Sequence, residues 1–210
     1  VPDCLLGGDW SQKLVALFRD YMNAERVVPY DEKTFKGEVR HLVARCVSGC
    51  LLVVVVSNGK FSRDLSPLIA RLKAEFDNFG LFVNVNEGKN NVILGKETQH
   101  IYGKKYIEGA HLGVKFRLQP QSFFQVNDAV KDGIYRQVKS LLDVSGTEVL
   151  VDCFSGIGIL TSVLCSPDYD TYAVEIEPSS VADAVAIKEL NRSPRLTNLQ
   201  GDANALLPQI

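Results

Sequence analysis

The sequence has no apolar run long enough to cross a membrane. The longest, Leu51–Val56, is far below the ~18 residues that a membrane span requires, and it lies within a strand pattern. The first residues also lack a basic segment followed by an apolar stretch, so we expect no secretory signal peptide. The sequence therefore predicts a cytoplasmic protein that has no membrane partner.

Cysteine is sparse and odd in number. The five cysteines, at positions 4, 46, 50, 153 and 165, provide no disulfide framework and are typical of a reducing compartment. Cys46 and Cys50 flank a predicted turn, but a second cysteine pair is missing, so we predict no metal site. We expect all five to act as small buried apolar residues.

A strong net charge is also absent. The value of −2 argues against a simple basic nucleic-acid binder. The charges are unevenly distributed, however. Residues 1–120 hold 17 Lys+Arg against 13 Asp+Glu, a balance of +4, and residues 121–210 hold 6 against 12, a balance of −6. Phosphate contacts would favour the front part, with chance variation over a solvated surface as the alternative.

The front part reads as a small α+β domain, residues 1–120, with an antiparallel sheet. Helical spacing is present around residues 14–22 and from residue 66. Two strands joined by the turn Ser48-Gly49 form a predicted hairpin. The strands that we predict in this part are residues 39–47, 50–57, 81–85, 92–94, 98–102 and 112–118.

The rear part, residues 121–210, alternates strands with helices, which is typical of a parallel, doubly wound sheet. Asn127 is a plausible N-cap of its first helix. Strands are predicted at residues 148–153, 171–174 and 196–200, and helices at 157–165 and 178–191. The predicted fold class is therefore α/β, a small α+β domain followed by the first half of a Rossmann-like domain.

The strongest chemical signal lies where an apolar strand meets a glycine turn. Val149–Asp152 is followed by Gly156 and Gly158, and glycines let a backbone approach a ligand closely. Glu175 lies 19 positions after Gly156, at the end of the next predicted strand, where it can accept hydrogen bonds from ribose hydroxyls. This spacing predicts a nucleoside-containing cofactor, and a purely structural strand–turn–helix is the alternative.

Two features favour S-adenosylmethionine over a dinucleotide as that cofactor. The dinucleotide fingerprint G-x-G-x-x-G requires a third glycine, but Thr161 occupies its position. Asp152 suits a positively charged ligand better than a pyrophosphate, and S-adenosylmethionine carries a sulfonium and no phosphate. Asp202, just after the third predicted strand, could accept a hydrogen bond from the adenine amine.

Several sequence strings resemble the RNA uracil-5-methyltransferases. Phe123–Asn127, Asp152–Gly158 and Val174-Glu175 resemble the family's methyltransferase domain. The strings that resemble the middle region of its bacterial 23S rRNA members are Tyr30–Thr34, Arg40–Arg45, Leu94–Thr98 and Ile101–Gly103. The resemblance implies that Gln125, Phe154 and Glu175 bind S-adenosylmethionine and that Asp202 lies on its adenine side. Ser155 and Ile159 depart from the family pattern, where Cys at the first position and Asn or Thr at the second are found.

The family's chemistry, carried over, implies an activity for the whole protein. A cysteine thiolate adds to carbon-6 of uracil, and carbon-5 takes the methyl group from the sulfonium. A base then removes the carbon-5 proton, which expels the cysteine from carbon-6. In the family both groups, and an Asp-Pro-Pro motif, follow the fourth strand, so we expect them beyond Ile210. The parent would form 5-methyluridine in 23S rRNA, and this fragment would be inactive. A tRNA-directed member, a non-catalytic RNA-binding module and, less favoured, a nucleotide-dependent oxidoreductase are the alternatives.

Two surfaces are expected to meet partners. His41 and Arg45 share a strand face and, with Arg40, Lys104 and Lys105, would form a patch facing RNA, or else a solvated sheet face. A parallel sheet that stops after three strands would leave the edge beside its first strand open, which favours self-association.

Overall fold

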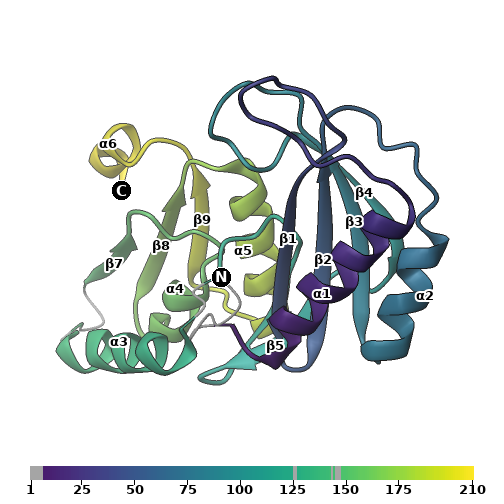
Figure 1. Ribbon diagram of the computed structural model, residues 1–210. Helices are drawn as coiled ribbons and strands as arrows, with labels where there is room; N and C mark the ends of the chain where they lie inside the picture. Colours follow the sequence, from purple (N-terminus) through teal and green to yellow (C-terminus); the bar gives the residue numbers. More distant parts are fainter. Residues whose placement is uncertain (1–6, 125–126, 143, 145–147) are drawn as a thin grey trace. The chain divides into compact units, whose positions relative to one another are not determined.

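The computed structural model describes residues 7–124, 127–142, 144 and 148–210 (Figure 1). The chain forms two compact units, Val1–Ile107 and Glu108–Ile210. The division precedes the boundary near Pro120 that the sequence predicts. The reason is a hairpin, β5 (Ile107–His111) and β6 (Val114–Leu118), which packs on a helix of the second unit.

The first unit is a four-stranded sheet with two helices. Its elements are α1 (Asp9–Ala24), β1 (Val39–Val47), β2 (Cys50–Ser57), α2 (Ser66–Glu75), β3 (Phe79–Val85) and β4 (Glu97–Gly103). The strand order is β1-β2-β3-β4. The predicted hairpin is confirmed, and its turn residues Ser48 and Gly49 both have positive φ, 51° and 74°, as in the two-residue turns that suit twisted strands.

The expectation of a wholly antiparallel sheet is wrong at one pair. Strands β2 and β3 run parallel, with Leu51 opposite Phe79 and Ser57 opposite Val85. The helix α2 lies between them in sequence and supplies the crossover that a parallel connection requires. The predicted strand at residues 92–94 does not form, because the Asn86 amide donates to the backbone carbonyls of this segment.

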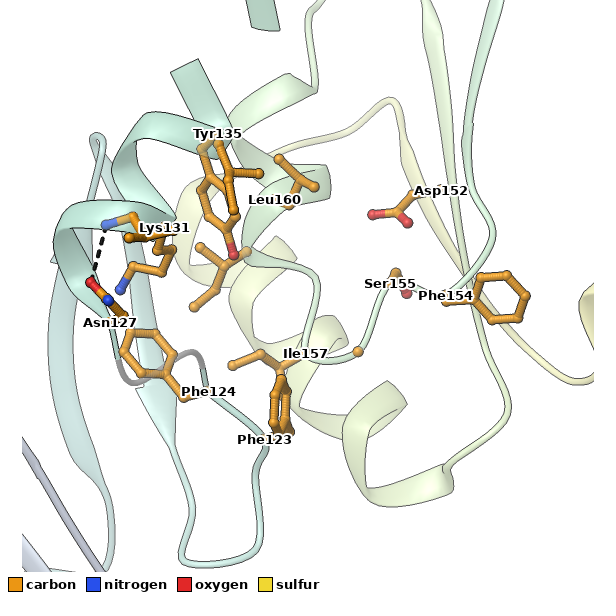
Figure 2. A pocket seen from close by; sticks show the side chains of 14 residues that line it. Phe123, Phe124, Asn127, Lys131, Tyr135, Asp152, Phe154, Ser155, Ile157 and Leu160 are labelled. Carbon is orange, nitrogen blue, oxygen red and sulfur yellow. Dashed lines mark hydrogen bonds between the residues drawn. The ribbon is translucent and has the colours of Figure 1, made fainter. Parts of the chain in front are cut away.

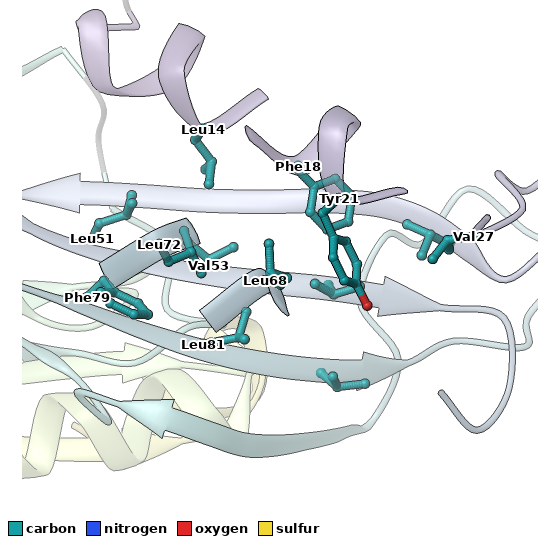
Figure 3. Close-up of a cluster of buried hydrophobic side chains, with 13 residues drawn as sticks. Leu14, Phe18, Tyr21, Val27, Leu51, Val53, Leu68, Leu72, Phe79 and Leu81 are labelled. Atoms are coloured by element: carbon teal, nitrogen blue, oxygen red, sulfur yellow. The ribbon is translucent and has the colours of Figure 1, made fainter. Parts of the chain in front are cut away.

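The core of the first unit lies between this sheet and its two helices (Figure 3). Leu14 and Phe18 of α1 and Leu68 and Leu72 of α2 meet alternate residues of the strands, as the 3.6 and 2.0 periodicities dictate. Tyr21 is fully buried, and its hydroxyl donates to the Asp64 carbonyl at 3.0 Å. That bond satisfies the only polar atom of this side chain, so burial of the ring is stabilising.

The second unit carries a three-stranded parallel sheet of order β7-β8-β9. Its further elements are α3 (Asp128–Leu141), β7 (Val149–Asp152), α4 (Ile159–Leu164), β8 (Asp170–Glu175), α5 (Pro178–Asn191), β9 (Leu196–Gln200), α6 (Ala203–Leu206) and the 3₁₀ turn η1 (Leu207–Gln209). The predicted alternation of strands and helices is confirmed. So is the Asn127 cap, whose Oδ1 accepts from the Val130 amide at 3.2 Å.

The hairpin and the segment after it are fastened to α5 by polar side chains. The Asn191 amide exchanges two hydrogen bonds with the backbone of Lys115 in β6, at 2.7 and 2.8 Å. The buried carboxylate of Asp183 accepts from Gln119 Nε2 at 2.8 Å and from the Ser122 hydroxyl. These bonds fix the chain just before the Phe123-Phe124 pair.

Candidate functional site

The glycine turn after β7 brings two of the predicted site residues, Gly156 and Glu175, into contact. Parallel strands place their carboxyl ends at one edge, and Asp152 of β7 lies opposite Ala173, two residues before Glu175 ends β8. Gly156 and Gly158 take φ of 54° and 76°, a conformation that favours glycine. A Cβ on Gly156 would meet nothing within 4 Å, so the turn backbone is open to a ligand there.

The Glu175 carboxylate is held in place by backbone amides. Its Oε2 accepts from the Gly156 amide at 2.9 Å, and its Oε1 accepts from the Glu177 amide at 2.8 Å. Each carboxylate oxygen has two lone pairs, so each retains an acceptor direction. Glu175 is therefore oriented at the strand end and still able to accept from a ligand hydroxyl.

The Asp152 carboxylate is oriented from the other side of the turn. Its Oδ2 accepts from the hydroxyl of Thr161, a fully buried residue of α4, at 2.6 Å. Thr161, which stands where the dinucleotide fingerprint requires a third glycine, therefore orients Asp152. Burial, with a smaller contribution from the Asp152 charge, raises the pKa of Tyr135 in α3, which keeps that phenol protonated.

A cavity of about 320 Å³ opens between α3 and the glycine turn. Its size falls at the lower end of the range for small-molecule sites. Figure 2 shows Tyr135 and Leu160 at the top of the view, Phe123 and Phe124 below them, and Asp152 to the right. The lining residues are Phe123, Phe124, Asn127, Val130, Lys131, Ile134, Tyr135, Asp152, Phe154, Ser155, Gly156, Ile157, Ile159 and Leu160. The cavity is therefore apolar and aromatic with a few charged groups.

Sequence reasoning missed the contribution of α3. Lys131 is buried, and its ammonium lies 3.9 Å from the ring centre of Phe124, a cation–π contact within the cavity wall. Tyr135 follows one turn later on the same face. Residues 127, 131 and 135 are spaced by four, so the helical period predicts that they share one face of α3. A lysine in such a pattern normally faces solvent, however, so the sequence does not indicate that Lys131 is buried.

The other predicted site residues have different placements. Phe154 is 87% exposed and points away from Tyr135 and Phe123 in Figure 2, although it borders the cavity. Asp202 caps α6 through the Asn204 amide at 2.8 Å, which gives it a structural role whatever else it does. Gln125 lies outside the described residues. Among the residues that are described, neither Glu175 nor Asp202 lines the cavity itself.

The predicted basic patch is divided within the first unit. The strand register places Arg45 at the end of the sheet where Lys104 and Lys105 follow β4. Arg40 and His41 lie at the opposite end. In the described part of the chain, no three His, Cys, Asp or Glu residues gather where they could hold a metal ion, and no helix is long and apolar enough to span a membrane.

The chain is similar in sequence to several RNA methyltransferases. It is 30% identical over 208 residues to an uncharacterized RNA methyltransferase of Listeria innocua, and the match covers 98% of this chain and 46% of the relative. It is 28% identical over 211 residues to one of Halalkalibacterium halodurans, covering 99% and 46%. The chain spans about half the length of these relatives. No family model matches it.

Solved structures show the fold. A tRNA (uracil-54, C5)-methyltransferase of Pyrococcus abyssi, in complex with S-adenosyl-L-homocysteine, matches with a TM-score of 0.78 and 20% identity. The match covers 95% of this chain and 49% of that one. Trm5 of Methanocaldococcus jannaschii, in complex with adenosine, matches with a TM-score of 0.51 and 16% identity, over 90% and 52%. The chain therefore has the Rossmann-like fold of S-adenosylmethionine-dependent methyltransferases, as the sequence predicts.

Proposed function

We propose that this chain is part of an S-adenosylmethionine-dependent RNA methyltransferase that forms 5-methyluridine, with 23S rRNA as its substrate. The observation that carries the proposal is the pair of oriented carboxylates, Asp152 and Glu175, at neighbouring strand ends around the open Gly156 turn. The similarity to RNA methyltransferases supports RNA as the substrate class. The fold shared with a tRNA uracil-5-methyltransferase keeps a tRNA substrate as the second candidate.

The residues present fit S-adenosylmethionine, which supplies an electrophilic methyl group on a sulfonium. Glu175 has acceptor directions left for two ribose hydroxyls. Asp152 provides negative charge beside a cavity whose other walls are largely apolar. The aromatic rings of Phe123 and Phe124 provide surfaces that exclude water from a bound methyl group. Phe154, Gly158, Gln125 and Asp202 complete the cofactor site that we propose.

We place the nucleophilic cysteine and the base outside the described residues, beyond Ile210, and propose that the chain alone is inactive. Cys153 and Cys165 do not line the described cavity. Burial raises the pKa of both the Cys46 and the Cys50 thiol, which disfavours the thiolate that attack on uracil requires. These four described cysteines therefore have the character of structural residues.

Calorimetry on the purified chain tests the cofactor assignment. We expect S-adenosylhomocysteine to bind with micromolar affinity and NAD not to bind, because the site offers carboxylates where a pyrophosphate would need amide donors. A parallel assay with radiolabelled S-adenosylmethionine and 23S rRNA should show no methyl transfer. Tight NAD binding would contradict the cofactor assignment. Methyl transfer to the rRNA would contradict the proposal that the nucleophile lies outside this chain.

The sheet edge at β7 supports the proposal that the chain self-associates. Among the described strands β7 pairs only with β8, so its other edge presents unpaired backbone groups. Val149 on this strand is 48% exposed. Light scattering should show a mass that rises with concentration, and Val149→Lys should restore the monomer, because an edge lysine disfavours strand pairing. A monomer at all concentrations would contradict this proposal.

A further inference from the structure

A second cavity, of about 300 Å³, lies wholly within the first unit. Two loops form it, residues 30–36 before β1 and residues 86–91 after β3, together with the first residues of β1. Its walls combine aromatic rings, cationic side chains and the amides of Asn90 and Asn91. Rings that stack on bases, beside cations that meet phosphates, are the features by which proteins hold single-stranded RNA.

The first loop presents an aromatic ring in a constrained backbone. Phe35 is 45% exposed and has a φ of 58°, which is unfavourable for a bulky residue. The loop enforces this conformation: the Phe35 amide donates to the Asp31 carbonyl at 2.8 Å, and the Lys33 amide donates to Asp31 Oδ1 at 2.7 Å. Gly37 closes it at a φ of 118°, where a Cβ would lie 2.3 Å from the Pro29 carbonyl oxygen. Strain of this kind concentrates at functional sites.

Arg40 connects the two loops across the cavity. Its guanidinium lies 4.5 Å from the ring centre of Tyr30, in the first loop. Its Nη1 donates to the carbonyls of Asn86 and Gly88, at 2.9 and 2.5 Å, in the second. The buried Nε of Arg40 has no hydrogen-bond partner among the described residues. Arg40 therefore orders the two loops and contributes a positive charge to the cavity wall.

The charge of the cavity favours an anion with an aromatic part. Arg40 and Lys89 are cationic side chains and Glu32 is an anionic one, so the charged part of the lining is net positive. The Lys89 ammonium lies over one face of the Phe35 ring, 4.8 Å from its centre, so a cation and an exposed ring are adjacent.

We propose that this cavity binds one or two nucleotides of single-stranded RNA outside the cofactor-binding unit. Phe35 stacks on a base, Lys89 meets the phosphate within the positive field of Arg40, and Asn90 and Asn91 contact polar base edges. The inference rests on the proposed RNA methyltransferase function and extends it by assigning part of the substrate contact to the first unit. The RNA class, rather than an acidic peptide, follows from the exposed ring beside the cations.

Fluorescence anisotropy with a labelled single-stranded RNA 12-mer at low salt tests this assignment. Phe35→Ala should weaken RNA binding about tenfold, because one stacked base is lost, whereas Phe35→Tyr should retain binding. Lys89→Gln should weaken it about threefold and lower the salt slope by about 0.7, the value for one phosphate contact on a single strand. Lys33→Gln is the matched control, an exposed lysine of the same loop that does not line the cavity.

An abasic oligonucleotide of the same length separates base stacking from charge. We expect it to bind about tenfold more weakly than the RNA and to show no further loss with Phe35→Ala. Equal binding of the abasic strand, equal competition by polyglutamate, wild-type affinity of both variants, or no binding of RNA to the wild-type chain would each overturn the inference. Binding of S-adenosylhomocysteine is measured on the same samples, so that failure of the proposed function is seen separately.

Discussion

Replacing Glu175 by glutamine should weaken the binding of S-adenosylhomocysteine by roughly 10- to 100-fold. A hydrogen bond to a charged acceptor contributes about 1.5–3 kcal/mol, and each 1.4 kcal/mol is a factor of ten in affinity. The carboxylate has an acceptor direction free on each oxygen, because the Gly156 and Glu177 amides occupy only one apiece. Glutamine retains one acceptor oxygen but presents the NH2 donor of its amide where the second ribose hydroxyl would donate.

The control for this variant is Glu177→Gln, two residues later in the chain. Glu177 is exposed, and its carboxylate accepts from the Ser179 hydroxyl at 3.1 Å, away from the glycine turn. We expect its affinity to stay within about twofold of wild type, since a surface charge contributes little. Because Glu175 also orients the turn, the melting temperature of both variants is measured. Unchanged affinity in Glu175→Gln would show that the ribose does not meet this carboxylate.

The strand-end carboxylates could be predicted from sequence because their positions follow from local patterns. The end of β7 is predicted by an apolar run that is followed by a glycine turn and a helix. The end of β8 is predicted by the next apolar run in the sequence. Parallel pairing then brings both ends to one edge without any further information. Asp152 and Glu175 are therefore predictable as neighbours, although their partners Thr161 and Gly156 are visible only in the structure.

Features that depend on residues distant in sequence could not be predicted in this way. The parallel pairing of β2 with β3 depends on where α2 packs, and the alternation of apolar residues is the same for either strand direction. The Asn86 side chain donates hydrogen bonds to the backbone carbonyls of the segment predicted as a strand, which forms a loop instead. Residue spacing does not predict such side-chain bonds. Burial of Lys131 likewise depends on the Phe124 ring, which lies before the helix.

The role of Asp183 also could not be predicted from the sequence, and its loss should lower the free energy of unfolding. Its position in α5 gives no sequence signal, yet the carboxylate is 5% exposed and accepts from both Gln119 and Ser122. The Ser122 hydroxyl in turn accepts from the backbone amide of Gln119 at 2.9 Å, which closes the segment into a turn. One buried side chain thus positions the segment that leads to the Phe123-Phe124 wall of the cavity.

Replacing Asp183 by alanine should lower the free energy of unfolding of the second unit by about 3 kcal/mol. The change removes a buried charged acceptor and leaves two donors without it, and each such loss costs about 1–3 kcal/mol. Affinity for S-adenosylhomocysteine should also fall, because the cavity wall formed by Phe123 and Phe124 loses its anchor. Urea unfolding followed by circular dichroism measures the first effect, and calorimetry measures the second.

Hydrogen exchange locates the damage that this variant causes. Amides of residues 119–124 and of α5 should exchange faster in Asp183→Ala, while those of α1 and α2 in the first unit keep their wild-type rates. Asp170→Ala is the matched control: Asp170 is exposed, and its ion pair with Arg195, at 2.9 Å, lies on the surface, so stability and exchange should change little. If Asp183→Ala unfolds at the wild-type urea concentration, the carboxylate does not anchor the segment and the cavity wall must be held by the packing of Phe124 on Phe116.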